Sequence, residues 1–182
     1  MKHPFVSVVI PTLNEEKFLP KLLASLAAQQ IKDFEVIIVD GSSKDRTVEQ
    51  AKRYGAKIPS LRVLVSEKSS LPLQRNMGAS VAKGEWLAFV DADSELLPYF
   101  MDRVQVFIRD TKPKLFSAWA RSDSPLVHDA IFTLLTNIYW EASVLFKRPG
   151  APGPLTIVRS DVFRAVGGYD ESHGFNEDID LG

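Results

Sequence analysis

The sequence predicts an α/β protein in which helices cover both faces of a mostly parallel β-sheet. In the first half of the chain, short apolar runs rich in β-branched residues alternate with longer segments of helical periodicity. The runs are apolar at nearly every position, which is typical of strands covered on both faces. A chain of 182 residues with 45% hydrophobic residues can enclose one sizeable core. We therefore expect a single three-layer α/β/α domain.

The first strand and helix are predicted near the N-terminus. Val6–Ile10 is a β-branched run, which favours a strand. Glu15–Gln30 carries leucines at helical spacing, with Thr12 or Asn14 in position to cap the helix and acidic residues in its first turn. A signal sequence is the alternative for residues 1–10, but the apolar stretch is short and runs directly into polar residues, so we expect a strand.

The same alternation continues as far as residue 90. The apolar runs are short and bounded by polar or turn-forming residues, and two of the helical segments stop at a glycine, a residue that ends helices because it readily adopts positive φ. The predicted elements are the strand Phe34–Val39, the helix Asp45–Tyr54 before Gly55, the strand Leu61–Val65, the helix Pro72–Lys83 before Gly84, and the strand Trp86–Val90.

The second half of the chain has fewer strands and one long apolar helix. We expect Asp129–Lys147 to bury its apolar stripe in the core, and the alternative is that one face meets a lipid or a membrane surface. The other predicted elements are the helix Leu96–Asp110, the strand Leu115–Ala120, the exposed loop Arg148–Pro154, the strand Leu155–Val158, the helix Asp161–Ala165 and the turn Gly167–Asp170.

Composition and charge exclude several classes of protein. The net charge of −1 argues against a broad basic surface, so we expect no nucleic-acid partner. The chain has no cysteine and hence no disulfide or thiolate metal site, which suits the cytoplasm. No uninterrupted apolar run approaches the roughly 18 residues needed to cross a bilayer. We expect a protein in the cytoplasm, either free or attached peripherally to the cytoplasmic face of the membrane.

Polar residues follow several of the predicted strands at the point where each strand ends. Asp91 and Asp93, separated by Ala92, follow the fourth strand. Two carboxylates in such a loop can hold Mg²⁺ or Mn²⁺, or they can simply form a turn and cap the next helix. Thr12–Glu16 and Asp40–Ser43 follow the first and second strands. Because the carboxyl ends of parallel strands lie at one edge of a sheet, where ligands bind, this convergence favours the cation site.

Several motifs occur in order along the whole chain. They are Val8–Glu16, Val39–Thr47, Arg75–Gly78, Gly84–Asp93, Val166–Glu171 and Glu177–Leu181. In this order they resemble glycosyltransferase family 2, the inverting nucleotide-sugar transferases with a GT-A fold. The resemblance implies a UDP- or GDP-sugar donor, Mn²⁺ or Mg²⁺ as cofactor, and single-step transfer with inversion to a glycan, lipid-linked or small-molecule acceptor. It also implies that residues 1–95 form the nucleotide-sugar-binding half of one domain and residues 96–182 its acceptor-side half.

The same resemblance assigns nucleotide-binding roles to residues at the strand ends. Pro11, Thr12 and Glu15 match positions that hold the base and ribose, and so does Asp40 after the second strand. A carboxylate suits this role because it accepts hydrogen bonds from a uracil N–H or from ribose hydroxyls. Arg75 matches a cation near the nucleotide, where charge-assisted bonds favour phosphate or carbonyl oxygens.

Metal and catalytic roles follow from the resemblance in the same way. Asp93 matches the direct metal ligand, and Asp91 lies nearer the ribose or the metal's waters. Ala92 stands in the nucleotide-sugar site where many relatives carry another acid, so metal binding would depend on Asp93 and the diphosphate. Asp178 matches the catalytic base, which takes the proton of the acceptor oxygen as the anomeric centre develops positive charge.

Several of these residues also have a structural alternative. Asp40 can begin a turn, and Arg75 can be a surface residue of its helix. Glu15 and Asp178 can each be an acidic partner of a helix N-terminus.

Two other functions are compatible with the sequence. A nucleotide-sugar-binding domain without turnover would keep the same fold. The chain stops at Asp180–Gly182, inside a motif that continues in relatives, which indicates a truncated acceptor side. A sugar-1-phosphate nucleotidyltransferase would also use acidic metal ligands, but it needs a basic, glycine-rich loop where this chain has the acidic segment 11–16.

Overall fold

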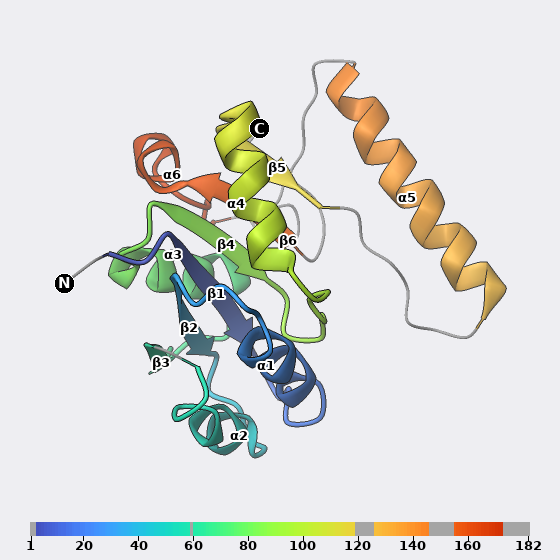
Figure 1. Ribbon diagram of the computed structural model, residues 1–182. Coiled ribbons are helices and arrows are strands. Elements are labelled where there is room, and N and C mark those ends of the chain that lie inside the picture. The colour runs from blue at the N-terminus through green and yellow to red at the C-terminus, as the bar shows by residue number, and fades with distance from the viewer. Residues whose placement is uncertain (1–2, 59, 119–125, 146–154, 173–182) are drawn as a thin grey trace.

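The protein is built around one six-stranded sheet (Figure 1). The computed structural model describes residues 3–58, 60–118, 126–145 and 155–172. The strands are β1 (Val6–Thr12), β2 (Phe34–Asp40), β3 (Leu61–Val65), β4 (Trp86–Val90), β5 (Leu115–Ser117) and β6 (Leu155–Arg159). They lie in the order β3-β2-β1-β4-β6-β5. Strands β1 to β4 are parallel to one another, whereas β6 pairs antiparallel with β4, and β5 antiparallel with β6.

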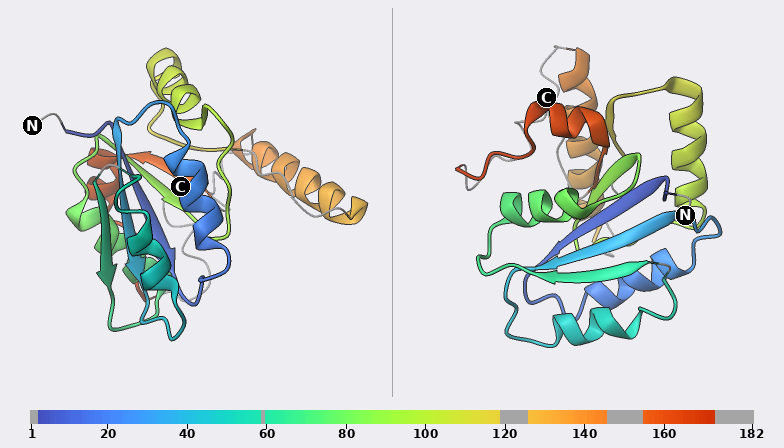
Figure 2. Two further views of the ribbon diagram at one scale, coloured as in Figure 1. Left: turned by 60° about the horizontal axis from the view of Figure 1, so that its bottom comes forward. Right: turned by 90° about the vertical axis from the view of Figure 1, so that its left-hand side faces the viewer.

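Helices cover both faces of this sheet, so the predicted three layers are present (Figures 1 and 2). The helices are α1 (Leu19–Ala27), α2 (Thr47–Arg53), α3 (Leu71–Val81), α4 (Phe100–Thr111), α5 (Val127–Leu145) and α6 (Ser160–Val166). Helices α1, α2 and α4 contribute buried residues to the core on one face, and α3 and α6 to the core on the other. The prediction of an α/β/α fold with a mostly parallel sheet is confirmed.

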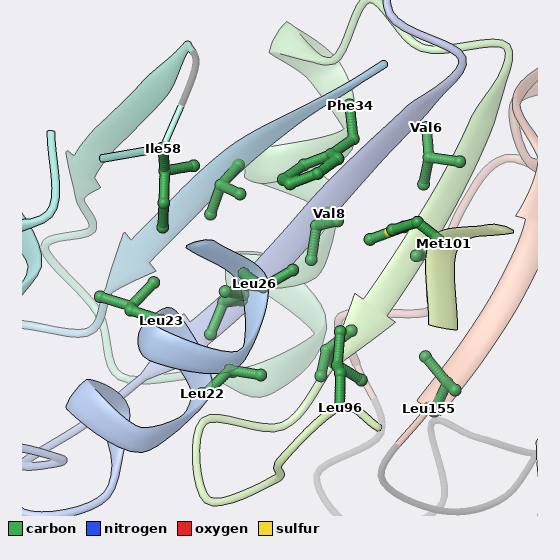
Figure 3. Close-up of a cluster of buried hydrophobic side chains, with 14 of the residues drawn as sticks. Val6, Val8, Leu22, Leu23, Leu26, Phe34, Ile58, Leu96, Met101 and Leu155 are labelled. Carbon is green, nitrogen blue, oxygen red and sulfur yellow. The ribbon is translucent and has the colours of Figure 1, made fainter. Parts of the chain in front are cut away.

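The central strands are buried along their whole length, which explains why their sequences are mostly apolar. Every residue of β1, β2 and β4 is buried. Because side chains alternate between the two faces of a strand, Val8 packs on the α1 side and Val9 on the α3 side. Figure 3 shows Leu22 and Leu26 of α1 and Met101 of α4 in the same apolar cluster as Val8. Burial of one such side chain contributes roughly 1.5–3 kcal/mol.

The strand register brings the ends of the parallel strands to the same level. Thr12 lies opposite Asp40 in the β1–β2 pair, and Asp40 lies opposite Val65 in the β2–β3 pair. Hydrogen bonds continue just past the strands, from the Gly41 N–H to the Thr12 carbonyl at 2.8 Å and from the Ser66 N–H to the Asp40 carbonyl at 2.7 Å. The loops that follow these strands therefore start from one edge, as the sequence predicted.

Helix α3 approaches the sheet unusually closely at Gly78. A Cβ at this position would lie 2.4 Å from Cγ1 of Val9, so only glycine fits. One turn earlier in the same helix, Gln74 and Arg75 are each only 3% exposed. The glycine contact thus holds two polar side chains against the strand ends.

Helix α1 begins later than predicted. It starts at Leu19 rather than Glu15, and its N-cap residue is Phe18, which makes no side-chain capping bond. Neither Thr12 nor Asn14 caps the helix. Asn14 has a φ of 57°, a left-handed conformation that interrupts the chain before the helix can start.

The second half departs from the prediction at several element ends. Helix α4 starts at Phe100 rather than Leu96, because Tyr99 before it has a φ of 61°. Strand β5 ends at Ser117, and the rest of its predicted range lies partly outside the described residues. The predicted loop 148–154 also lies outside them.

Helix α5 contradicts the prediction that its apolar stripe is buried in the core. Figures 1 and 2 show α5 standing apart from the sheet. Ile131, Leu135 and Ile138, which belong to this stripe, are 52%, 59% and 48% exposed. The periodicity identified an apolar face correctly but could not tell what covers it. Among the described residues, no helix combines the length and the apolar character needed to cross a membrane.

Candidate functional site

The candidate site is the rim of the sheet, defined as the carboxyl ends of β1, β2 and β4 with the loops that follow them. Thr12 and Asp40 form its buried floor, with 2% and 1% of their surface exposed. Oδ1 of Asp40 accepts hydrogen bonds from the Thr12 and Ser43 hydroxyls, and Oδ2 accepts one from the Ser43 N–H at 2.8 Å. These bonds orient the Asp40 carboxylate and build the turn after β2. Asp40 therefore begins a turn, which is the structural alternative that the sequence analysis gave for this residue.

The loops after β1 and β2 are joined by side chain–backbone hydrogen bonds between residues 14–16 and 43–47, here called the loop bridge. The N–H groups of residues 14, 15 and 16 donate to side-chain oxygens of Ser43, Thr47 and Asp45 at 2.8, 2.7 and 3.1 Å. In return, the side chains of Asn14 and Glu16 accept from the N–H groups of residues 44 and 46. The loop bridge holds the segment before α1 in a non-helical turn and fixes it beside Asp40.

The variant Asp45→Asn tests the loop bridge. Burial alone would raise the pKa of Asp45, but hydrogen bonds from Thr47 and from the Glu16 N–H outweigh it and lower the pKa below the ordinary value of 3.8. A lowered pKa stabilises the fold above that ordinary value, and the contribution is lost as the pH falls through the folded-state pKa. We expect Asp45→Asn to reduce the free energy of unfolding by about 1 kcal/mol at neutral pH and by less in strong acid.

Urea unfolding over a pH series measures this effect. Asp110→Asn, at an exposed position of α4, is the matched control and should change little at any pH. A loss for Asp45→Asn that is the same at every pH would contradict the assigned role of the charge.

Glu15 lies close to the predicted metal-binding acids. Burial raises the pKa of its carboxyl, and the negative charges of Asp93, Asp45 and Asp91 raise it further. Asp91 and Asp93 belong to the loop after β4, and the side chain of Asp91 is 38% exposed. The fold therefore brings carboxylates from the loops after β1, β2 and β4 into one region of negative potential at the rim.

These carboxylates fit a divalent cation that takes part of its coordination from a ligand. Carboxylate oxygens are the donors that Mg²⁺ and Mn²⁺ prefer, and a cation would relieve the repulsion that raises the pKa of Glu15. Within the described part of the chain, no three acidic or histidine side chains are arranged to hold a metal ion by themselves. The donor set suits a cation held by one or two carboxylates together with phosphate oxygens.

The variant Glu15→Gln tests the crowding of charge at the rim. Because the pKa of Glu15 is raised in the folded protein, the ionised carboxylate costs stability as the pH rises above 4.5 through the folded-state value. We expect Glu15→Gln to raise Tm by about 1–2 °C at pH 7 and to have less effect near pH 4. Calorimetric melting at both pH values measures this, with the exposed Glu67→Gln as control. A lower Tm for Glu15→Gln at pH 7 would contradict the electrostatic account.

Arg75 lies in the site and is not a surface residue of its helix. Its side chain is 4% exposed, and its Nη2 donates to Oδ1 of Asp91 at 3.3 Å. Its guanidinium carbon lies 5.2 Å from the centre of the Tyr169 ring. The fold thus places a planar cation beside the acids of the β4 loop, where it can bind phosphate or carbonyl oxygens.

The remaining predicted residues differ in how they relate to the rim. Pro11 is buried at the end of β1, and the side chain of Ala92 is buried in the core on the α1 face. Pro11 thus borders the rim, whereas the side chain of Ala92 belongs to the core. Asp178, the predicted base, lies outside the described residues.

Gln74 of helix α3 contacts the rim, and the sequence analysis missed it. Its Nε2 donates to the carbonyls of Thr12 at 3.0 Å and Val39 at 2.7 Å, and so ties together the ends of β1 and β2. A Cβ on Gly41 would lie 3.1 Å from Oε1 of Gln74, so the loop and the amide are closely packed. The only signal was a polar residue next to Arg75, and a helix pattern alone does not say that such a residue is buried.

Two hollows of about 700 Å³ each lie at the opposite end of the sheet. Both are lined by Phe5 and Glu85, which precede β1 and β4, and by Arg159 at the end of β6. Ligands of open α/β sheets bind outside the carboxyl ends of the parallel strands. The convergent acids and the buried arginine are likewise at the carboxyl ends, so the rim and not these hollows is the candidate site.

Comparison with solved structures identifies the fold as GT-A. Staphylococcus aureus TarS 1–349 in complex with UDP is similar over 96% of this chain and 52% of that one, with a TM-score of 0.77 and 26% identity. The mannosyltransferase PcManGT of Pyrobaculum calidifontis, in complex with GDP-Man and Mn²⁺, is similar over 98% of this chain and 51% of that one, with a TM-score of 0.73 and 20% identity.

The chain belongs to glycosyl transferase family 2, whose family model matches residues 7–163. A PGL/p-HBAD biosynthesis glycosyltransferase of Mycobacterium bovis is 31% identical over 180 residues, which cover 93% of this chain and 65% of that protein. The uncharacterized glycosyltransferase YibD of Escherichia coli is 38% identical over 93 residues, covering 51% of this chain and 27% of that protein. The chain thus spans 65% of the length of the mycobacterial relative. The resemblance of the sequence motifs to this family is confirmed.

Proposed function

We propose that this chain is the catalytic part of a metal-dependent, inverting glycosyltransferase that moves a sugar from a UDP- or GDP-sugar to an acceptor hydroxyl or phosphate. The observation that carries the proposal is the convergence of Glu15, Asp91 and Asp93 with buried Arg75 at the carboxyl edge of a GT-A sheet. Family membership supports it. The neighbours add support, because TarS was solved with UDP and UDP-GlcNAc, and PcManGT with GDP-Man and Mn²⁺.

In this proposal the rim binds the nucleotide and its diphosphate. The buried floor with Pro11, Thr12 and Asp40 receives the base and ribose, and Arg75 holds phosphate or carbonyl oxygens by charge-assisted bonds. Asp93, with Asp91 beside it, holds Mn²⁺ or Mg²⁺. When bound, the cation acts as a Lewis acid that neutralises the charge of the departing diphosphate.

Asp178 is the proposed catalytic base. The acceptor oxygen must lose a proton while it attacks the anomeric carbon, and a carboxylate within hydrogen-bond reach can take that proton. Attack from the face opposite the diphosphate inverts the configuration at that carbon. The support for Asp178 is its place in the motif Glu177–Leu181.

The acceptor is proposed to meet residues 96–182, which makes residues 1–95 the donor half of the domain. The exposed apolar side chains of α5 support a lipid-linked acceptor or peripheral contact with the cytoplasmic face of a membrane. Glycan and small-molecule acceptors are the alternatives.

A thermal-shift screen of UDP-, GDP- and dTDP-sugars with Mn²⁺ tests the donor site, because a ligand that binds only the folded state raises Tm. We expect a rise for at least one of these donors in the presence of Mn²⁺ and little without it. If no nucleotide binds with any divalent ion, the proposal fails. A donor-hydrolysis assay then separates an enzyme from a binding domain, since only an enzyme releases free sugar.

A further inference from the structure

A side-chain amide of helix α3 binds the backbone of the chain segment after α6. Nδ2 of Asn76 donates to the Tyr169 carbonyl at 2.8 Å, and its Oδ1 accepts from the Tyr169 N–H at 2.9 Å. One side chain thus satisfies both backbone polar groups of a residue 93 positions away. The same Nδ2 also donates to Oε1 of Glu171 at 3.0 Å.

The turn before Tyr169 is shaped to receive this amide. Gly167 and Gly168 have φ values of 91° and 82°, which only glycine adopts at little cost. A Cβ on Gly168 would lie 2.7 Å from Oδ1 of Asn76. Any larger residue at 168 would therefore strain the backbone and also push the amide away.

The turn places the Tyr169 ring against Arg75. The ring lies 5.1 Å from that of Phe89 in β4 and 5.6 Å from that of Phe163 in α6, so its position is set by packing against these two rings. The Arg75 guanidinium carbon is 5.2 Å from the ring centre, a distance at which a cation is attracted to an aromatic face. Arg75 in turn donates to Asp91.

We propose that Asn76 is a positioning residue for nucleotide binding: it fixes Tyr169, whose ring sets the Arg75 guanidinium at the rim beside Asp91. The proposal rests on the proposed function in one respect, namely that Arg75 contacts the bound nucleotide. The proposal assigns one shared role to two sequence motifs, Arg75–Gly78 and Val166–Glu171, because Asn76 belongs to the first and Tyr169 to the second.

Mutant cycles on nucleotide affinity test the pathway from Asn76 to Arg75. Calorimetry with UDP or GDP and Mn²⁺ would compare wild type, Asn76→Ala, Arg75→Ala and the double variant. We expect Asn76→Ala to weaken binding by about 5- to 10-fold in the wild-type background and by less than about 2-fold when Arg75 is already absent, because coupled residues are non-additive. Equal factors in both backgrounds would overturn the proposal, since they would mean that Asn76 acts without Arg75.

A second variant guards against simple loss of folding. Tyr169→Leu keeps the backbone groups that Asn76 binds but removes the ring under Arg75, and it should show the same loss and the same non-additivity. Ser160→Ala is the control, because it removes a buried hydrogen bond of 2.7 Å to the Gly84 carbonyl at the far end of the sheet. It should lower Tm without changing nucleotide affinity.

A measurement without ligand keeps this inference separate from the proposed function. In wild type the buried Arg75 side chain should give a protected Nε–H signal by NMR. We expect that signal to exchange faster in Asn76→Ala and Tyr169→Leu but not in Ser160→Ala. If wild type binds no nucleotide, the proposed function fails and this signal alone decides the positioning role. An unchanged Arg75 signal in Asn76→Ala overturns it.

Discussion

Asp93→Ala is expected to abolish Mn²⁺-dependent binding of UDP or GDP. Asp93 is exposed at the rim, and its charge helps to raise the pKa of Glu15, so it faces the region where a cation is needed. Mg²⁺-type sites commonly use one or two carboxylates and complete their coordination with substrate phosphates. The neighbouring Ala92 offers no side-chain oxygen, and Asp91 is already bound to Arg75. We expect affinity to fall at least roughly 100-fold, equivalent to about 2.7 kcal/mol.

Calorimetric titration of nucleotide with and without Mn²⁺ gives this result directly. Glu95→Ala is the matched control, since Glu95 is an acid in the same loop that pairs with Lys21 at 3.1 Å and lies on the surface. It should leave the nucleotide affinity within about 2-fold, as exposed ion pairs contribute little. Asp93→Ala protein that binds nucleotide with Mn²⁺ as tightly as wild type would remove Asp93 from the metal site.

Asp178→Asn is expected to abolish sugar transfer while leaving nucleotide binding nearly intact. Asparagine is close in size to aspartate but cannot accept the proton of the acceptor oxygen. General-base catalysis typically contributes 10²–10⁴-fold to the rate, so turnover should fall by about that factor. The nucleotide is expected to bind at the rim without help from this carboxylate, so its Kd should change by less than about 2-fold.

The comparison needs a donor identified by the thermal-shift screen, followed by measurement of UDP or GDP release. Asp180→Asn removes a carboxylate from the same motif and serves as the control for charge alone. We expect it to keep most of the turnover. If Asp178→Asn turns over at the wild-type rate, Asp178 is not the base.

Much of the fold of residues 1–95 could be predicted because its sequence signals are local. Strands β1, β2 and β4 are buried throughout, and each is a mostly apolar run with turn-forming or acidic residues at or just after its end. Parallel pairing then requires that their carboxyl ends share one edge. The convergence of Glu15 with Asp91 and Asp93 follows from this rule.

The start of α1 and the loop bridge could not be predicted. Glu15 and Glu16 fit the first turn of a helix, but their N–H groups are bound by Thr47 and Asp45 across the rim. These bonds join residues that are 32 and 29 positions apart in the chain. Helical periodicity describes neighbours along the chain and carries no information about such partners.

Helix α5 shows that periodicity also gives no information about which surface covers an apolar face. Its apolar stripe was recognised from spacing, yet Ile131 and Leu135 of that stripe are each more than 50% exposed. A hydrophobic face predicts that something covers it, but the spacing of side chains does not name the covering surface.

The amino-acid pattern predicts the fold class, the order of strands and helices in residues 1–95, and the edge at which acids gather, because all three depend on local periodicity and on the geometry of parallel strands. The folded structure was needed to show that Asp40 is held by Ser43 and Thr12, that Arg75 is buried beside Asp91, and that Asn76 binds the backbone of Tyr169. Apart from the bonds between Ser43 and Asp40, these contacts join residues at least 16 positions apart in the chain. They exist because close packing at positions such as Gly78 leaves buried polar groups no water to bind, so each must find a partner within the protein.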